Sequence, residues 1–267
     1  MSDLKVTLIQ SQLHWEDKEA NLRMFDEKIN SIKEKTEVVF LPEMFSTGFS
    51  MESERLAETM DGTAVQWMRK KAAEKNIIIT GSLIIKENGE YLNRLIWMLP
   101  NGTYGTYDKR HLFGYAGEHE HYTPGNKRLI AQVKGWKINL NICYDMRFPV
   151  WARNSIQPDT NEAAYDVLVY VANWPERRKT AWTTLLQARA IENQVFAIGV
   201  NRVGNDGNNI YHSGETSLID PMGEIIYRKS HDEDIFTYTL QRERLEEVRK
   251  NIPFLKDADA FTFVPKG

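Results

Sequence analysis

The sequence predicts an α/β fold with a mixed sheet, and three observations support this class. Short apolar runs typical of buried strands alternate with segments whose apolar residues recur at helical spacing. Two later β-rich runs flank Pro221-Met222-Gly223, which indicates an antiparallel hairpin. The chain has 267 residues, and large α/β folds routinely reach this length as one unit. We therefore expect a single domain over residues 1–267.

The first part of the chain predicts strands that alternate with helices. Residues 6–10 are a β-branched run and predict the first strand. A helix over residues 20–33 is predicted by apolar residues at helical spacing: Leu22, Phe25, Ile29 and Ile32. The apolar run 38–41 predicts a buried strand that ends at Pro42. The next expected elements are a helix over 64–75, a strand over 77–85, and a strand over 94–99 that stops at Pro100-Asn101-Gly102.

The second part continues with strands whose ends carry reactive or aromatic residues. Residues 137–142 alternate and end at Cys143, and the apolar run 166–172 ends at Asn173-Trp174-Pro175. The remaining expected elements are a helix over 182–192, a strand over 195–200, a hairpin of 217–220 with 224–227, a strand over 235–240 and a helix over 242–250. In open α/β sheets, chemistry gathers beyond the carboxyl ends of strands, which singles out Glu43, Cys143 and Asn173-Trp174.

The composition is that of an ordinary soluble globular protein, with 42% hydrophobic and 27% charged residues. A formal net charge of -3 gives no electrostatic footprint for nucleic acid. No apolar run approaches the roughly 20 residues that cross a membrane, and the first residues lack the basic and apolar regions of a signal peptide. The single cysteine excludes an intrachain disulfide and fits a reducing compartment. We expect a cytoplasmic protein that binds neither nucleic acid nor membrane.

Cys143 is the first candidate for chemistry. Taken alone, a single cysteine is most often a buried structural thiol. Its place at a strand-to-helix junction favours a nucleophile, because helix N–H groups there lower a thiol's pKa and can stabilise an oxyanion. A cysteine nucleophile needs a base. Histidine is the usual base, but none of the available histidines has a diagnostic spacing: His111, His119, His121 and His212.

Glu43 and Lys109 complete a candidate catalytic set. A carboxylate serves as a base when burial raises its pKa towards neutrality. Glu43 follows an apolar strand, so it lies at the rim of an apolar region. Lys109 could neutralise the oxyanion of a tetrahedral intermediate. Taken alone, each of these two residues is more often an ordinary charged group at the surface.

Together these residues carry a family resemblance. Leu41-Pro42-Glu43-Met44-Phe45, Tyr107-Asp108-Lys109-Arg110-His111-Leu112-Phe113 and Asn141-Ile142-Cys143-Tyr144-Asp145-Met146-Arg147-Phe148-Pro149 resemble, in order and spacing, the signature segments of the nitrilase superfamily of carbon–nitrogen hydrolases. Within it the chain most resembles the bacterial omega-amidases, which hydrolyse the terminal amide of 2-oxoglutaramate or 2-oxosuccinamate. The resemblance implies a four-layer α-β-β-α sandwich, a homodimer paired through the sheet-covering helices, and no cofactor.

The resemblance also implies roles for single residues. Glu43 would be the base, Lys109 and the backbone N–H of Tyr144 would hold the oxyanion, and Cys143 would form a thioester. Glu118 matches a second glutamate that orients Lys109 or assists proton transfer, although Glu120 lies close by in sequence. For the substrate, the resemblance implies a carboxylate clamp and two pocket walls: Arg147, Phe113 and Trp174.

Three alternatives stay open. Gly117-Glu118-His119-Glu120-His121 has histidines and carboxylates that can bind zinc, but it lacks the helical i, i+4 histidine pair of a zinc hydrolase. A catalytically silent binding protein on the same fold is a second alternative, because fold does not fix function. The third keeps the catalytic set but acts on a nitrile, a carbamoyl compound or another amide. A cation deep in the pocket, at Arg147, separates the omega-amidase hypothesis from this third one.

Overall fold

The computed structural model describes residues 2–262. Its helices are α1 (Lys18–Asn30), α2 (Ser53–Leu56), α3 (Thr63–Lys75), α4 (Glu118–His121), α5 (Pro149–Ala152), α6 (Lys179–Asn193) and α7 (Arg242–Asn251). Its strands are β1 (Leu4–Gln10), β2 (Val38–Phe40), β3 (Ile78–Glu87), β4 (Glu90–Met98), β5 (Tyr104–Asp108), β6 (Leu129–Val133), β7 (Trp136–Ile142), β8 (Ile156–Gln157), β9 (Glu162–Ala163), β10 (Val167–Val171), β11 (Phe196–Val200), β12 (Val203–Asn205), β13 (Tyr211–Ile219), β14 (Ile225–Ser230) and β15 (Asp234–Leu240).

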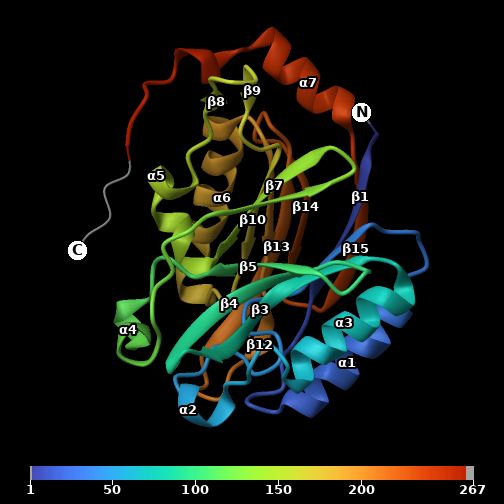
Figure 1. Cartoon of the computed structure of the whole chain (residues 1–267), viewed down its shortest axis with the longest axis vertical. Coiled ribbons are helices and arrows are strands. Elements are labelled where there is room, and N and C mark those ends of the chain that lie inside the picture. The colour runs from blue at the N-terminus through green and yellow to red at the C-terminus, as the bar shows by residue number, and fades with distance from the viewer. Residues whose placement is uncertain (1, 263–267) are drawn as a thin grey trace.

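Apart from the small two-stranded sheet β8-β9, the described strands form two large mixed sheets that pack face to face, with helices outside (Figure 1). The first sheet has the order β15-β1-β2-β3-β4-β5, and α1 and α3 cover its outer face. The second has the order β12-β13-β11-β10-β7-β6, with β14 added to β13, and α6 covers it. The predicted α/β class and the α-β-β-α sandwich are confirmed. No helix within residues 2–262 is long and apolar enough to cross a membrane.

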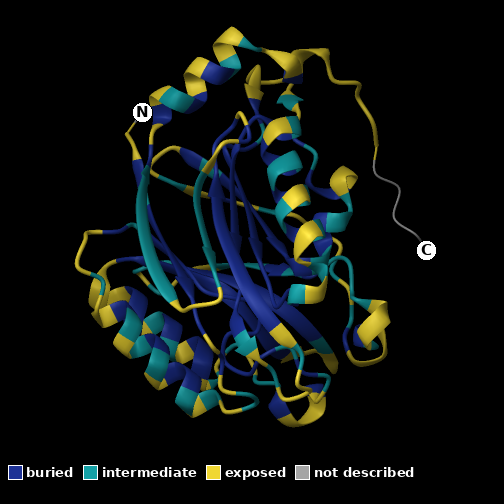
Figure 2. Cartoon of the chain, turned by 180° about the vertical axis from the view of Figure 1, so that it is seen from behind, coloured by how far each residue is buried: buried dark blue, intermediate teal, exposed yellow. Residues whose placement is uncertain are grey.

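The buried strands explain why their sequences are continuous apolar runs. Val38 and Phe40 on β2 face the core between the two sheets, whereas Val39 faces the core under α1 and α3. Both faces of the sheet are therefore covered, as is usual where parallel strands carry helices on one side. Figure 2 shows this buried interior between the two helical layers.

Parallel pairing brings three strand ends to one edge of the sandwich. β1, β2 and β3 run parallel in the first sheet, and β7, β10 and β11 run parallel in the second. Glu43 follows β2, Cys143 follows β7, and Asn173 follows β10. The carboxyl ends singled out by the sequence therefore meet.

The predicted elements are present, with differences at several places. The helix predicted over 20–33 begins at Lys18 and ends at Asn30, where Ser31 caps it, so Ile32 lies outside the helix. β5 and β6 were not predicted; β6 is an edge strand whose residues are mostly half-buried or exposed, so its apolar signal is weak. The predicted hairpin is confirmed, as β13 pairs antiparallel with β14, but β13 begins earlier, at Tyr211.

Candidate active site

Glu43 is held rigidly at the end of β2. Its side chain is fully buried. The next residue, Met44, has a left-handed backbone with φ of 43°, and its N–H donates to Oγ of Ser82 at 2.8 Å. The carboxylate accepts from the backbone N–H of Asn173 at 2.8 Å and from Nδ2 of Asn93 at 2.9 Å. This set of donors fixes the orientation of Glu43 and connects the two sheets.

Lys109 lies directly after β5 and points its ammonium at two buried carboxylates. Its Nζ donates to Oε1 of Glu43 at 2.9 Å and to the two oxygens of Glu118 at 3.0 and 2.9 Å. Burial favours the neutral amine, but the charges of Glu118 and Glu43 outweigh it and raise the pKa of Lys109. Lys109 is therefore a fixed cation at neutral pH.

Glu118, and not Glu120, is the glutamate that meets the lysine. Glu118 is fully buried and also accepts from Nδ2 of Asn93 at 3.2 Å and from the backbone N–H of Phe113 at 2.5 Å. Burial, opposed by Lys109, raises the pKa of Glu118. Glu120 is exposed, and its Oε1 lies 3.9 Å from Nε2 of His119. The sequence left the choice between Glu118 and Glu120 open. In the structure, the fold of α4 places Glu118 against Lys109.

Cys143 directly follows β7 and is the first residue of a short 3-10 helix, Cys143–Arg147; its backbone is left-handed, with φ of 43°. A non-glycine residue there is strained, and such strain clusters at functional sites. We expected helix N–H groups to lower the thiol's pKa. That expectation is wrong: burial, followed by the charge of Glu43, raises the pKa of Cys143 well above its ordinary value, and Lys109 offsets this only in part. The resting thiol therefore keeps its proton and needs a neighbouring base.

Asp145 connects the nucleophile segment to the lysine segment. Its buried carboxylate accepts from the backbone N–H of Ile142 at 3.0 Å and of His111 at 2.9 Å. It also accepts from the hydroxyl of Tyr107 at 2.7 Å and pairs with Nδ1 of His111 at 2.8 Å. Because Tyr107 and His111 flank Lys109, this carboxylate sets the distance between the thiol and the ammonium. Asp145 was not predicted to be a positioning residue.

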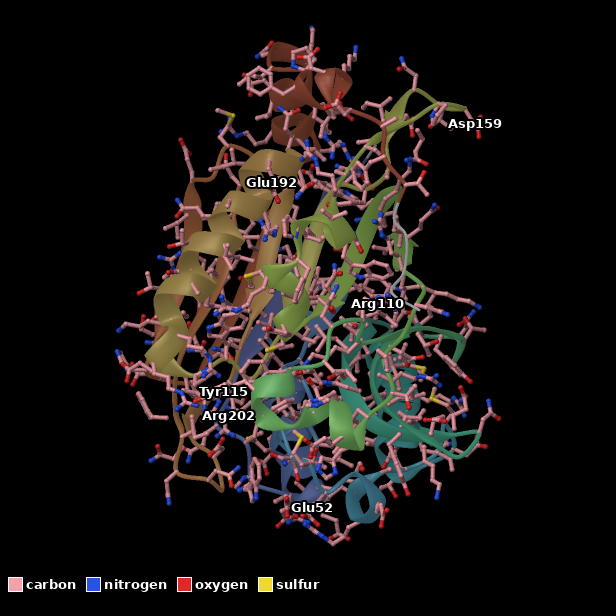
Figure 3. All side chains as sticks on the ribbon, turned by 90° about the vertical axis from the view of Figure 1, so that its left-hand side faces the viewer. Glu52, Arg110, Tyr115, Asp159, Glu192 and Arg202 are labelled. Atoms are coloured by element: carbon pink, nitrogen blue, oxygen red, sulfur yellow. The ribbon has the colours of Figure 1, made fainter. Side chains whose placement is uncertain are left out.

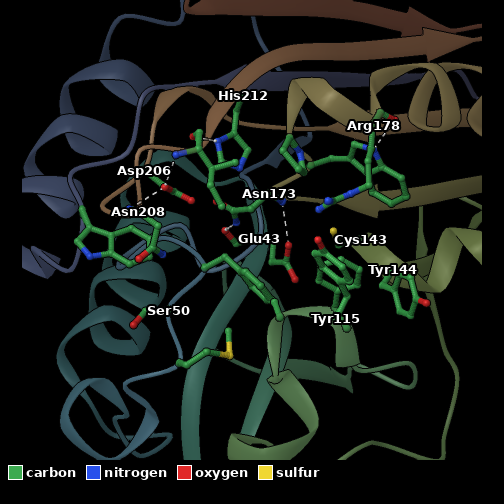
Figure 4. Close-up of a pocket in the computed structure, with 18 of the residues that line it drawn as sticks. Glu43, Ser50, Tyr115, Cys143, Tyr144, Asn173, Arg178, Asp206, Asn208 and His212 are labelled. Atoms are coloured by element: carbon green, nitrogen blue, oxygen red, sulfur yellow. Dashed lines mark hydrogen bonds between the residues drawn. The ribbon is translucent and has the colours of Figure 1, made fainter.

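A cavity of about 460 Å³ opens above this set, a size usual for small-molecule sites. Glu43, Lys109 and Cys143 line it, and Figure 4 shows Glu43, Asn173 and Cys143 directed into it. Tyr144, predicted to hold the oxyanion, also lines it, as do the residues predicted to bind substrate: Arg147, Phe113 and Trp174. The ring of Phe113 packs edge-on against Tyr144, with centroids 4.9 Å apart.

The cavity also contains groups that the sequence analysis did not propose. Asn93 donates to both buried glutamates from β4. Its only sequence signal is an asparagine inside an apolar strand. Arg178, from the turn before α6, lines the same wall as Arg147. The strand end at Asn173 was noted, but its two hydrogen bonds to Glu43 could not be seen in the sequence.

The segment considered as a zinc site is arranged differently. Glu118 turns inward to Lys109, whereas His119 and His121 are exposed on α4. Within residues 2–262 no cluster of three or more His, Cys, Asp or Glu side chains is arranged to hold a metal ion.

Comparisons with known proteins agree with this geometry. The chain matches the carbon–nitrogen hydrolase family over residues 5–250. It is 44% identical to the omega-amidase YafV of Escherichia coli strain K12, over 98% of this chain and 99% of that protein. It is 29% identical to the 2-oxoglutaramate amidase of Bacillus subtilis strain 168, over 94% of this chain and 96% of that protein.

Solved structures show the same similarity. XC1258 from Xanthomonas campestris, described as a CN-hydrolase superfamily protein with an arsenic adduct in the active site, superposes with a TM-score of 0.97 at 40% identity. That match covers 99% of this chain and 100% of the other. The predicted resemblance to the nitrilase superfamily, and within it to omega-amidases, is confirmed. The chain belongs to the carbon–nitrogen hydrolase family.

Proposed function

We propose that this protein is an omega-amidase, which hydrolyses the terminal amide of 2-oxoglutaramate or 2-oxosuccinamate to the keto acid and ammonia. The observation that carries the proposal is the convergence of Glu43, Lys109 and Cys143 at the floor of a cavity that also contains arginines. The full-length similarity to an omega-amidase and to a 2-oxoglutaramate amidase supports the same substrate class.

In the proposed acylation step, the Cys143 sulfur attacks the amide carbon while Glu43 takes the thiol proton. The carbonyl oxygen becomes an oxyanion, which the ammonium of Lys109 and the backbone N–H of Tyr144 hold. Glu43 then gives its proton to the departing nitrogen. The carbon–nitrogen bond breaks, ammonia leaves, and the acyl group remains as a thioester on Cys143.

In the proposed deacylation step, water attacks the thioester and Glu43 takes a proton from it. The carbon–sulfur bond breaks, and the proton returns to the sulfur as the acid leaves. Glu118 accepts from Lys109 through both of its oxygens, next to Glu43, so its proposed role is to orient the ammonium. No metal or cofactor takes part in these steps.

Arg147 is the proposed clamp for the distal carboxylate of the substrate. It lines the cavity, and its guanidinium lies over the ring of Trp174 at 4.9 Å, so the aromatic face holds the cation in place. A neutral amide or a nitrile has no carboxylate for this cation to bind. The competing substrate classes therefore predict a different response to Arg147→Ala.

The test of the proposed function is ammonia release from a panel of 2-oxo acid amides, glutamine, asparagine and simple nitriles. Cys143→Ala should abolish turnover while thermal unfolding stays close to that of the wild type. Glu43→Gln should abolish turnover, because Glu43 is the proposed base of both steps; any thioester that still forms should persist and be visible by mass spectrometry. Appreciable amidase activity in Cys143→Ala would refute the nucleophile. Equal losses in Arg147→Ala for charged and neutral amides would refute the clamp.

We also propose a single domain over residues 1–267, a homodimer and a cytoplasmic location. The family match spans most of the chain. Ile191 on the sheet-covering helix α6 is 52% exposed, and Val150 of α5 is 48% exposed, which favours pairing through this face. Light scattering on wild type and Ile191→Glu would test the dimer. The free thiol needed by the mechanism fits a reducing compartment.

A further inference from the structure

We propose that Arg178, acting beside Arg147, is the specificity-determining residue that recognises the 2-oxo group and rejects a 2-amino group. The inference rests on the proposed omega-amidase function. It adds to that function a second arginine and a defined choice between substrates that differ only at one carbon.

The two arginines are arranged alike on one wall of the cavity. The Arg147 guanidinium lies 4.9 Å from the ring centroid of Trp174, and the Arg178 guanidinium lies 4.9 Å from that of Phe113. The indole N–H of Trp174 also donates to the backbone oxygen of Arg178 at 2.8 Å. Aromatic faces hold the two cations in place and leave their N–H edges for a ligand.

Neither cation is neutralised by the protein. Within residues 2–262, neither Arg147 nor Arg178 forms an ion pair with a carboxylate. Burial, and then the charge of the neighbouring Arg177, lower the pKa of Arg178, and Arg147 acts in the same direction. Half-buried cations of like charge without a counter-ion indicate a site that an anion completes.

The carboxylates that line this cavity have other partners: Glu43 pairs with Lys109, and Glu16 and Glu52 pair with Arg55. Figure 4 shows Asp206 on one side of the pocket and Arg178 with Tyr144 on the other. Asp206 already accepts from the backbone N–H groups of Asn208 and Ile210, at 2.8 and 2.9 Å. An ammonium placed at the arginine wall would therefore meet positive charge without a carboxylate partner.

The chemistry of a 2-oxo acid fits this wall. Its carboxylate and adjacent ketone oxygen accept hydrogen bonds only, and guanidinium groups donate only. One arginine can bind the carboxylate bidentately while the second bridges to the ketone oxygen. Glutamine has an ammonium in place of the ketone, which supplies only donors and a like charge. Glutaramate has neither group and serves as the neutral reference.

The experiment measures kcat/KM for 2-oxoglutaramate, glutaramate and glutamine, which differ only at carbon 2. Arg178→Gln should lower the preference for 2-oxoglutaramate over glutaramate by about 10- to 100-fold, the loss expected for a charge-assisted hydrogen bond. Arg178→Lys should keep the rejection of glutamine but lose preference for the ketone. Arg147→Gln should lower kcat/KM for all three substrates, since each has the distal carboxylate.

Arg177→Gln is the matched control. Arg177 is the adjacent residue, carries the same charge and also lines the cavity, but it is exposed and its guanidinium lies 5.9 Å from the ring centroid of Tyr115. If Arg178 acts locally, the control keeps the wild-type preference. Equal changes in Arg177→Gln and Arg178→Gln would overturn the proposal in favour of general electrostatic attraction. If the ratios of kcat/KM between the three substrates are unchanged in Arg178→Gln, the proposal is overturned.

A binding measurement separates failure of this inference from failure of the proposed function. Calorimetry with 2-oxoglutarate compares Cys143→Ala with Cys143→Ala/Arg178→Gln, and neither protein turns over substrate. The double variant should bind 2-oxoglutarate at least about 10-fold more weakly than Cys143→Ala does. Cys143→Ala should bind glutamate poorly. Equal affinities would overturn the role of Arg178, whatever the wild type hydrolyses. Ammonia release from none of the three amides would refute the omega-amidase function itself.

Discussion

Replacing Asp145 with alanine should destabilise the protein more than most single substitutions, because its carboxylate joins segments of both sheets. The change removes the acceptor for the N–H groups of Ile142 and His111 and for the hydroxyl of Tyr107. Ile142 and Tyr107 are almost completely buried, so their donors have no access to bulk water. His111 is partly exposed and can be rehydrated.

The expected magnitude follows from the donors left without partners. A buried donor without an acceptor costs about 1–3 kcal/mol. Leaving Ile142 N–H and Tyr107 O–H unsatisfied gives a loss of about 3–5 kcal/mol in the free energy of unfolding, allowing for the lost packing. Asp145→Asn keeps an acceptor for His111 but turns an N–H₂ group towards Ile142 N–H. It should therefore lose about 1–3 kcal/mol.

The assay is urea unfolding of wild type, Asp145→Ala and Asp145→Asn, with the slope against denaturant checked for each. Asp159→Ala is the control, because Asp159 is exposed in the connection between β8 and β9 and projects outward (Figure 3). Its change should stay within about 0.5 kcal/mol. An Asp145→Ala protein as stable as that control would refute the assignment of Asp145 as the connecting residue.

Two further predictions concern titratable groups. The positive charge of Lys109 lowers the pKa of Cys143, and the negative charge of Glu118 raises it. Lys109→Met should therefore move the pH midpoint of iodoacetamide alkylation upward, and Glu118→Gln should move it downward. Shifts of the same sign in the two variants would contradict this reasoning. Burial lowers the pKa of His212 to about 4, below its unfolded value of about 6.5. The unfolded state therefore binds the proton first, and stability is lost as pH falls from about 6.5 to 4, by about 3 kcal/mol. Acid unfolding of His212→Gln should be shallower in that window, and an unchanged slope would exclude His212 as the cause.

Much of this fold could be predicted from local sequence, because its strands are buried on both faces. Residues 38–41 and 167–172 are continuous hydrophobic runs, so the positions after them, including Glu43, were located correctly. β5 was missed because most of its residues are exposed or half-buried. The helix α1 was extended too far because Ile32 continues the apolar spacing beyond the cap at Ser31.

The site was predictable only where residues occur in recognisable segments. Asn93 meets Glu43 across 50 positions of sequence, and Asp145 meets Tyr107 across 38. No local pattern contains such pairings, because tertiary packing creates them. Arg177 and Arg178 are neighbours of the same type and both line the cavity, yet Arg177 is exposed whereas Arg178 is half-buried over the ring of Phe113. Sequence cannot separate them, because the course of the turn after Pro175 decides which of the two is buried.

The buried contacts of Glu43, Lys109 and Glu118 have a consequence for the movement of protons. In the proposed mechanism, the proton taken from sulfur goes to ammonia, and the proton taken from water returns to sulfur. Both transfers pass through one carboxylate whose neighbours are fixed within about 3 Å. The proton circuit is therefore closed within the protein and needs no relay to bulk solvent. The cavity mouth has to admit only the amide and water, and to release ammonia and the acid.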